Sequence, residues 1–150
     1  MKFIAFLLLL TTGEYAVGQT QDNDAIKKCI TLFFDGMAKN DTNIIKHSLD
    51  SSCFLYSVMK TKSGKTILEE ESVNDFFRQV IELKGNKADE QLLSYDIKID
   101  GAMAIAWTPY KFYFNDKFSH CGVNVFTLIR RENEWKIMGI TDTRRKQGCE

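Results

Sequence analysis

The chain has 150 residues, and its 20 Lys and Arg side chains balance its 20 Asp and Glu side chains, so the formal net charge is zero at pH 7. This balance lacks the basic excess typical of proteins that bind nucleic acid or an anionic membrane surface. With a single proline and no linker or repeat, residues 19–150 have the size of one domain with a substantial core.

Residues 1–18 have the pattern of a cleavable signal peptide. A basic residue precedes an apolar run at residues 3–10, and Ala16 and Gly18 supply the small side chains of a cleavage site before Gln19. The apolar run is about half of the roughly 20 residues that a membrane-spanning helix needs. We therefore expect this segment to be removed and the protein to be secreted or periplasmic, with no membrane attachment after cleavage.

Three helices are predicted in the first half of the chain. Apolar residues recur three and four positions apart over residues 24–39, which predicts an amphipathic helix. Asp41 can cap a second, shorter helix that runs to residue 50. Ser72, with Asp75 three positions later, forms a capping box for a third helix, and Gly85 is placed to end it.

Alternating apolar and polar residues predict the strands. The expected strands are residues 52–60, 66–68, 93–100, 102–114, 118–131 and 135–143, with a polar loop over residues 84–90. Turn sequences at Asp100-Gly101 and Asn115-Asp116 join the last four strands into an antiparallel meander. Helices that precede such a meander can cover its concave face, so we expect an α+β fold with three helices packed on a strongly curved antiparallel sheet.

The four cysteines, Cys29, Cys53, Cys121 and Cys149, all follow the predicted cleavage site. In an exported chain they favour one or two disulfides, and the sequence alone leaves three pairings open. Cys121 is the first candidate partner for Cys149, whereas Cys29 and Cys53 lie among apolar residues that suit buried thiols. No paired Cys-x-x-Cys element is present and only two histidines occur, so no metal site is expected.

Four segments carry a resemblance to a known superfamily. They are Phe-Phe-Asp-Gly-Met at residues 33–37, Trp-Thr-Pro-Tyr-Lys-Phe-Tyr at 107–113, Phe-Ser-His-Cys-Gly-Val-Asn at 118–124 and Asp-Thr-Arg-Arg-Lys at 142–146. Over nearly all of residues 19–150 the chain resembles the nuclear transport factor 2-like superfamily, with lumazine-binding and SnoaL-like proteins as the nearest subgroup. The resemblance implies a cone-shaped α+β barrel, frequently a homodimer, with a pocket between the helices and the concave sheet.

The candidate pocket residues follow from the register of the predicted hairpin. A two-residue turn places Trp107 opposite Asn124, so Trp107 is expected to share a face with His120 and Asn124. A one-residue shift in this register would exchange the two faces. With this face concave, the expected ligand-binding residues are Tyr56, Trp107, His120 and Asn124, which suit a small hydrophobic or aromatic molecule.

The superfamily includes ketosteroid isomerases, scytalone dehydratase and proteins that only bind ligands, so the resemblance implies no single activity. The first hypothesis is an exported binding module without chemistry and without a cofactor, because few titratable groups are expected in the pocket. The alternative is a proton-transfer lyase or isomerase of the ketosteroid isomerase or dehydratase type. His120 would transfer the proton, Asp142 would orient it if the last strand carries a bulge, and Asn124 or Tyr56 would stabilise a developing enolate-like oxygen.

Each candidate residue also has a purely structural interpretation. His120 can be a hydrogen-bonded histidine near the mouth of the hairpin, and the aromatic residues of 107–118 can pack the core and a dimer. The basic cluster at 144–146 can grip an anionic ligand or form a solvated chain end. A deep cavity holding His120 beside Asp142 or another carboxylate would favour the enzyme.

Overall fold

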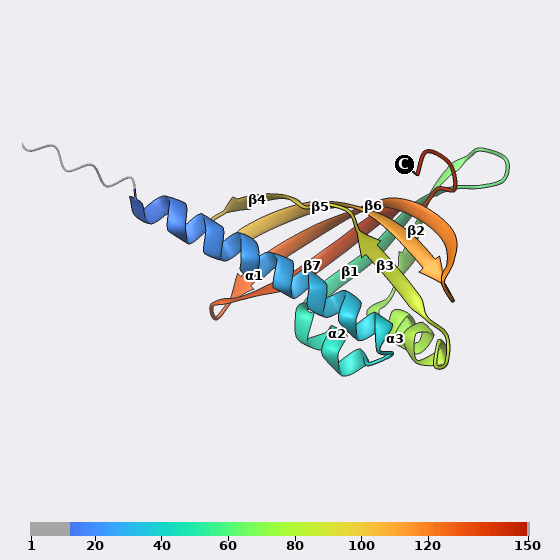
Figure 1. The fold of residues 1–150 in the computed structure, drawn as a ribbon, viewed down its shortest axis with the longest axis horizontal. Helices are drawn as coiled ribbons and strands as arrows, with labels where there is room; N and C mark the ends of the chain where they lie inside the picture. Colours follow the sequence, from blue (N-terminus) through green and yellow to red (C-terminus); the bar gives the residue numbers. More distant parts are fainter. Residues whose placement is uncertain (1–12, 150) are drawn as a thin grey trace, which may run out of the picture.

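The computed structural model describes residues 13–149, with side chains described from Thr20 onward. The helices are α1 (Gly13–Ala38), α2 (Thr42–Ser48) and α3 (Val73–Glu82). The strands are β1 (Leu49–Lys60), β2 (Thr66–Glu71), β3 (Ala88–Leu92), β4 (Asp96–Asp100), β5 (Met103–Phe114), β6 (Lys117–Arg131) and β7 (Glu134–Thr143). Figure 1 shows the long helix α1 lying under the curved sheet, as the predicted α+β fold requires.

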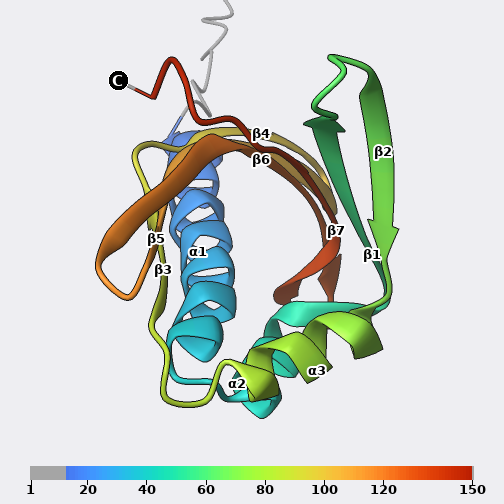
Figure 2. The ribbon, with the colours of Figure 1, turned by 90° about the vertical axis from the view of Figure 1, so that its right-hand side faces the viewer.

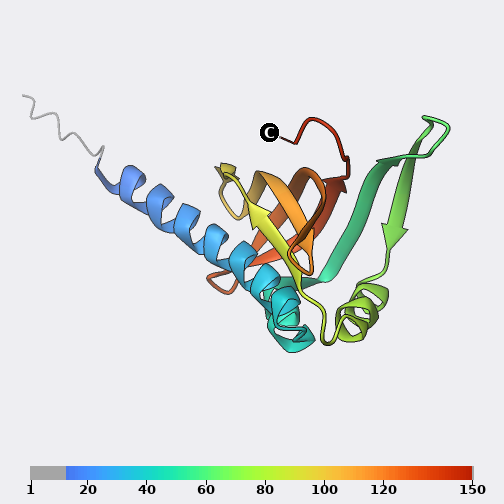
Figure 3. The ribbon, with the colours of Figure 1, turned by 45° about the vertical axis from the view of Figure 1, so that its right-hand side comes forward.

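The seven strands form one sheet in the order β2-β1-β7-β6-β5-β3, and β4 also pairs with β5. The predicted antiparallel meander is confirmed in β4, β5, β6 and β7. Strand β1 pairs with β7 in parallel, which makes the sheet mixed. Figure 2 shows the sheet arching around α1 with α2 and α3 at one end of the arch, and Figure 3 shows the β1–β2 hairpin projecting on the far side.

Helix α1 lies in the hollow of the sheet and occupies part of it (Figure 2). Its residues Ile26, Ile30 and Phe33 are buried in the core, as the apolar spacing predicted. In the first half of the helix, Asp22 accepts hydrogen bonds from Arg130 Nη2 at 2.6 Å and from Trp135 Nε1 at 3.2 Å, which anchors the helix to the sheet. The helix thus lies across the concave face.

The helix begins at Gly13, upstream of the predicted start, and runs through the predicted cleavage point before Gln19. The apolar run at residues 3–10 lies outside the described residues, so the signal peptide stays a prediction. Within residues 13–149, none of the helices is both long enough and apolar enough to cross a membrane.

Both predicted helix caps are confirmed. The Asp41 carboxylate accepts hydrogen bonds from the backbone N–H groups of Asn43 at 2.9 Å and Ile44 at 3.3 Å. Ser72 Oγ accepts a hydrogen bond from the Asp75 N–H at 3.1 Å and donates one to its carboxylate at 2.6 Å. These caps fix where α2 and α3 begin, and α3 in turn forms one wall of the hollow beside α1.

The predicted polar loop at residues 84–90 is wrong in its second half. Strand β3 begins at Ala88 and pairs antiparallel with β5, which sets Glu90 opposite Phe112. The segment is polar and has low intrinsic strand propensity, so its pairing with β5 decides its conformation. As a result, Glu90 lies on the sheet that surrounds the hollow.

The β5–β6 hairpin contains a bulge that counting along the sequence misses. The predicted two-residue turn at Asn115 and Asp116 forms, with φ angles of 50° and 61°. Beyond the turn, Ser119 is an extra residue on β6, so Phe112 lies opposite His120. A bulge of this kind shifts the register by one residue and changes which β5 side chains share a face with β6.

A second register shift lies in the last strand. Leu128 pairs with Ile137 but Thr127 pairs with Gly139, which leaves one extra residue on β7. This shift sets Asp142 opposite Asn124. The bulge in the last strand that the sequence-based hypothesis required is therefore present.

The C-terminal segment is fixed to β6 by a disulfide. Cys121 and Cys149 are bonded, with a Cα–Cα separation of 5.7 Å, which confirms the first candidate pairing. Cys29 and Cys53 are free thiols, one buried and one half-buried. The backbones of Cys121 and Arg145 exchange two hydrogen bonds of 2.9 Å, so the segment after β7 lies along β6.

Candidate functional site

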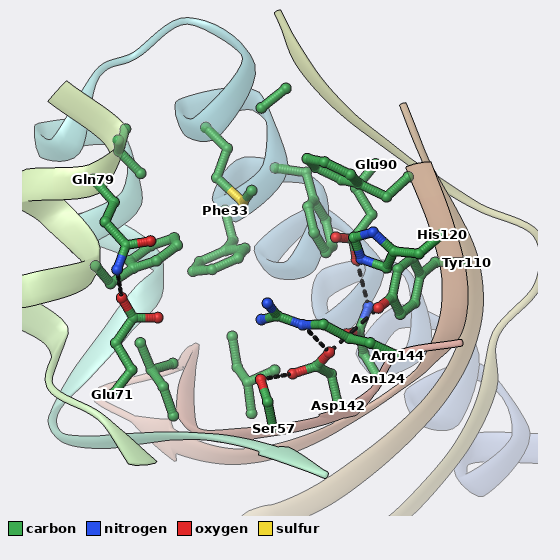
Figure 4. Close-up of a pocket in the computed structure, with 18 of the residues that line it drawn as sticks. Phe33, Ser57, Glu71, Gln79, Glu90, Tyr110, His120, Asn124, Asp142 and Arg144 are labelled. Atoms are coloured by element: carbon green, nitrogen blue, oxygen red, sulfur yellow. Dashed lines mark hydrogen bonds and ion pairs between the residues drawn. The ribbon is translucent and has the colours of Figure 1, made fainter. Parts of the chain in front are cut away.

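A cavity of about 230 Å³ lies between α1, α3 and the concave face of the sheet. The apolar side chains that line it are Phe33, Phe34, Met37, Leu55, Phe76, Val80, Leu83, Ala88, Phe112 and Ile140. The polar ones are Tyr56, Ser57, Glu71, Gln79, Glu90, Tyr110, His120, Asn124, Asp142 and Arg144. Figure 4 shows the labelled polar groups gathered around the cavity, with Phe33 above them.

The helical side of the cavity is aromatic. The rings of Phe33 on α1 and Phe76 on α3 stack in parallel, with centroids 5.5 Å apart. Phe34 follows Phe33 on the same helix and meets the core residue Phe126 edge to face at 6.0 Å. Successive aromatic residues on α1 therefore join the cavity to the core, and they give it a flat apolar wall.

Asp142 is the centre of the polar side. Its carboxylate accepts hydrogen bonds from Ser57 Oγ, from the Tyr110 hydroxyl at 3.2 Å and from Arg144 Nε at 2.9 Å. Ser57 reaches it because β1 and β7 run in parallel with these two residues paired. Asp142 is only 8% exposed, and these donors together with the Arg144 charge compensate its burial.

Tyr110 acts as a hydrogen-bond donor in this group. Its hydroxyl also reaches the Thr143 carbonyl oxygen at 3.0 Å. Burial, reinforced by the negative charge of Asp142, raises the pKa of the Tyr110 hydroxyl far above its ordinary value. The hydroxyl therefore stays protonated at physiological pH, and it fixes the end of β7 against β5.

Glu90 enters the cavity from β3. Asn124 Nδ2 on β6 donates a hydrogen bond to Glu90 Oε1 at 2.7 Å. Part of the side chain borders the open cavity, while protein atoms enclose the carboxyl group. Burial raises the pKa of Glu90 to about 7, although the bond from Asn124 opposes the shift. A carboxyl group in this state can gain or lose a proton near neutral pH.

His120 lies beside aromatic rings at the β6 end of the cavity. Its ring centroid is 4.9 Å from that of Phe112 and 5.8 Å from that of Tyr110. Burial, and next the nearby charge of Arg144, lower the pKa of His120 below its ordinary value. Among the described residues no hydrogen bond joins His120 to Asp142, although both line the same cavity.

The expectation that Trp107 shares a face with His120 and Asn124 is wrong. Because of the Ser119 bulge, Thr108 lies opposite Asn124, and Trp107 lies on the outer face of the sheet, 52% exposed. Tyr110 and Phe112, which the sequence assigned to packing, line the cavity instead. The outer face also exposes Met103 and Ile105. The expected homodimer stays a prediction.

The remaining predicted site residues, Tyr56, His120, Asn124 and Asp142, line one cavity. The sequence analysis missed Glu71 and Glu90, and it left the role of Arg144 open. Nothing near Glu90 signals a site, because its neighbours are polar and its position depends on pairing with β5. Arg144 had a usable signal, since it lies two residues after Asp142, just beyond the end of β7, and side chains two apart in an extended chain point to the same side.

Residues 13–149 contain no group of three or more His, Cys, Asp or Glu side chains placed to hold a metal ion. What the cavity does offer is one carboxyl group that titrates near neutral pH, one histidine with a lowered pKa and one guanidinium group. Such a set can bind a polar group of a ligand or move a proton.

No family model matches the chain, and no curated protein matches its sequence. Solved structures do match. An NTF2-like protein of unknown function from Shewanella baltica is 16% identical and superposes with a TM-score of 0.63, covering 85% of this chain and 97% of that one. A protein of unknown function from Mycobacterium tuberculosis is 10% identical, with a TM-score of 0.69 and coverages of 89% and 77%.

A third structure, a proposed dehydratase of the NTF2-like family from Streptomyces avermitilis, is 11% identical with a TM-score of 0.64. It covers 85% of this chain, and this chain covers 98% of it. At identities this low, structural similarity supports a shared fold and does not indicate a shared activity. The helices inside a curved mixed sheet and the likeness to these structures agree: the protein has the cone-shaped fold of the nuclear transport factor 2-like superfamily.

Proposed function

We propose that the protein is a binding module that holds a small molecule in the cavity between α1, α3 and the concave sheet. The observation that carries this proposal is the cavity itself, because a cavity of about 150 Å³ already admits benzene and this one measures about 230 Å³. Its stacked Phe33 and Phe76 rings suit an apolar or aromatic body, and the groups around Asp142 suit a polar substituent.

Binding can be tested with benzyl alcohol as a probe in an NMR titration of the isotope-labelled protein. The expected shifts cluster at cavity residues such as Phe33, Tyr56 and Phe112. Leu83→Trp places a larger side chain at the cavity wall and is expected to weaken binding about tenfold or more, since filled volume excludes the probe. Native mass spectrometry of protein purified gently from its host then identifies the natural occupant.

Leu93→Trp is the matched control, because Leu93 is exposed and does not line the cavity. This variant is expected to bind the probe as the wild type does. Shifts that map to the outer face around Trp107, or equal binding by the Leu83 and Leu93 variants, would count against the cavity as the binding site.

We also propose that the protein is exported. The Cys121–Cys149 disulfide supports this, because disulfides persist in oxidising compartments and are rare in the cytosol. Cleavage before Gln19 would leave the Asp22 anchor of α1 in place. Intact-mass measurement on protein from its host is expected to show a chain that begins at Gln19 and contains the disulfide. A chain that still begins at Met1 would contradict it.

A proton-transfer lyase or isomerase is the second candidate. It is favoured by a specific observation, namely that His120, Asp142 and Glu90 line the same cavity. Glu90, with a pKa of about 7, is then a stronger candidate for the proton-transferring group than His120. The discriminating measurement is turnover of the natural occupant: unchanged return of that molecule supports binding alone, and a product supports the enzyme.

A further inference from the structure

Two carboxylates border the cavity without a cationic partner. Figure 4 shows Glu71 and Glu90 on opposite sides of it. Through Oε1, each accepts a hydrogen bond from a neutral amide, Glu71 from Gln79 and Glu90 from Asn124. Within the described part of the chain, neither glutamate forms an ion pair and neither Oε2 has a hydrogen-bond partner. Each carboxylate therefore keeps one oxygen for a ligand.

The cationic groups of the cavity offset these charges only in part, because the charge of Arg144 lowers the pKa of both glutamates but less than burial raises it. Arg144 is the one Arg or Lys among the lining residues described, and its Nε donates to Asp142 at 2.9 Å, so this pair cancels. His120 has a lowered pKa, which leaves its imidazole mostly neutral at neutral pH. Burial also raises the pKa of Glu71. The cavity thus carries excess negative charge to the extent that Glu71 and Glu90 are ionised.

The aromatic walls favour the same sign of ligand charge. Phe33 of α1 and Phe76 of α3 stack on each other at the cavity wall, and Phe112 lines the cavity from β5. The faces of aromatic rings attract cations, because the ring quadrupole is negative above and below the plane. An anion would meet these faces and three carboxylates, with only the Arg144 side chain to attract it.

We propose that the ligand carries a protonated amine on a small aromatic or apolar body, and that the free Oε2 of Glu90 accepts a hydrogen bond from this ammonium group. The inference rests on the small-molecule binding proposed above and adds the chemical class of the ligand. An ammonium group has several N–H donors and a positive charge, which are what a half-satisfied carboxylate in an enclosed site lacks.

The charge of Glu90 makes this binding dependent on pH. The groups around it are Tyr110 from β5, Asn124 and His120 from β6, Asp142 from β7 and Arg144 beyond β7. With a pKa of about 7, the ionised fraction of Glu90 rises about tenfold between about pH 6 and about pH 8. Because the ammonium binds the ionised form, its affinity rises with pH over this range.

The test compares benzylammonium, benzyl alcohol and benzoate, which share one ring and differ in charge, in NMR titrations at about pH 6 and about pH 8. At the higher pH, benzylammonium is expected to bind about tenfold more tightly than benzyl alcohol, and benzoate most weakly. The affinity of benzylammonium is expected to fall about tenfold at the lower pH. Glu90→Gln is expected to remove both the preference for the amine and the pH dependence.

Glu134→Gln, which changes an exposed glutamate outside the cavity, is the matched control and is expected to behave as the wild type. If Glu90→Gln does not fold, the pH series on the wild type still decides the matter. Equal binding of the three probes, or a preference for benzoate, overturns the amine inference and leaves small-molecule binding standing. If none of the probes shifts cavity resonances, both proposals fail.

Discussion

The substitution Gly122→Ala is expected to lower the free energy of unfolding by about 3 kcal/mol, the upper part of the range for overpacking a well-packed interior. A Cβ atom at this position would overlap the backbone carbonyl oxygen of Thr143 and lie 2.7 Å from Cε1 of Tyr110. Backbone on one side and a buried ring on the other leave little room to relax. The end of β7 must therefore move away from β6.

This displacement would also disturb the cavity, because Asp142 and Arg144 flank Thr143. Urea denaturation gives the stability change, and Gly64→Ala provides the comparison. A Cβ on Gly64 meets no atom within 4 Å, and only its φ of +83° opposes the substitution, at a cost of about 1–2 kcal/mol. Equal midpoints for the two variants would show that β7 tolerates the displacement.

Loss of the Cys121–Cys149 disulfide is expected to destabilise the protein by about 3.5 kcal/mol. The bond links residues 28 positions apart. In the loop-entropy model, a crosslink over this span lowers the conformational entropy of the unfolded chain, which raises the free energy of that state by about this amount. The measurement is urea unfolding of Cys149→Ser beside the oxidised wild type. Reductant should bring the wild type to the level of the variant.

Cys53→Ser is the matched control, because Cys53 is a half-buried free thiol. This variant should keep the response to reductant that Cys149→Ser loses. Close to the disulfide, Arg145 exchanges two backbone hydrogen bonds with Cys121, and these hold the neighbouring Arg144 at the cavity. If reductant leaves the unfolding midpoint of the wild type unchanged, the disulfide contributes nothing to stability.

Local chemistry accounts for the parts of the fold that the sequence predicted correctly. Ser72 and Asp75 form a capping box from side chains that are three residues apart, so the start of α3 depends on nothing distant. The turn at Asn115 and Asp116 likewise depends on two residues that tolerate positive φ. Signals of this kind lie within a few positions of the feature they specify, and a single sequence is enough to find them.

The site was harder to predict because the faces taken by three residues, two inside the cavity and one outside it, depend on distant pairing. Glu90 faces the cavity only because a polar segment pairs with β5, and Glu71 only because β2 extends beyond its predicted end. Trp107 was assigned to the wrong face because the sequence around Ser119 contains no signal that predicts a bulge. Whether a residue faces the hollow or the solvent is decided by strand register, which single-sequence periodicity leaves undetermined.

The bulge at Ser119 also bears on how the β5–β6 hairpin can vary in length. Chain ends and hairpin tips are usually the places where insertions and deletions do least harm. Here the orientation of His120 and Asn124 relative to Tyr110 depends on one additional residue between the turn and the cavity. Removing Ser119 would shift β6 by one residue relative to β5, so that different side chains of this hairpin would face the cavity. The composition of both strands would stay almost the same.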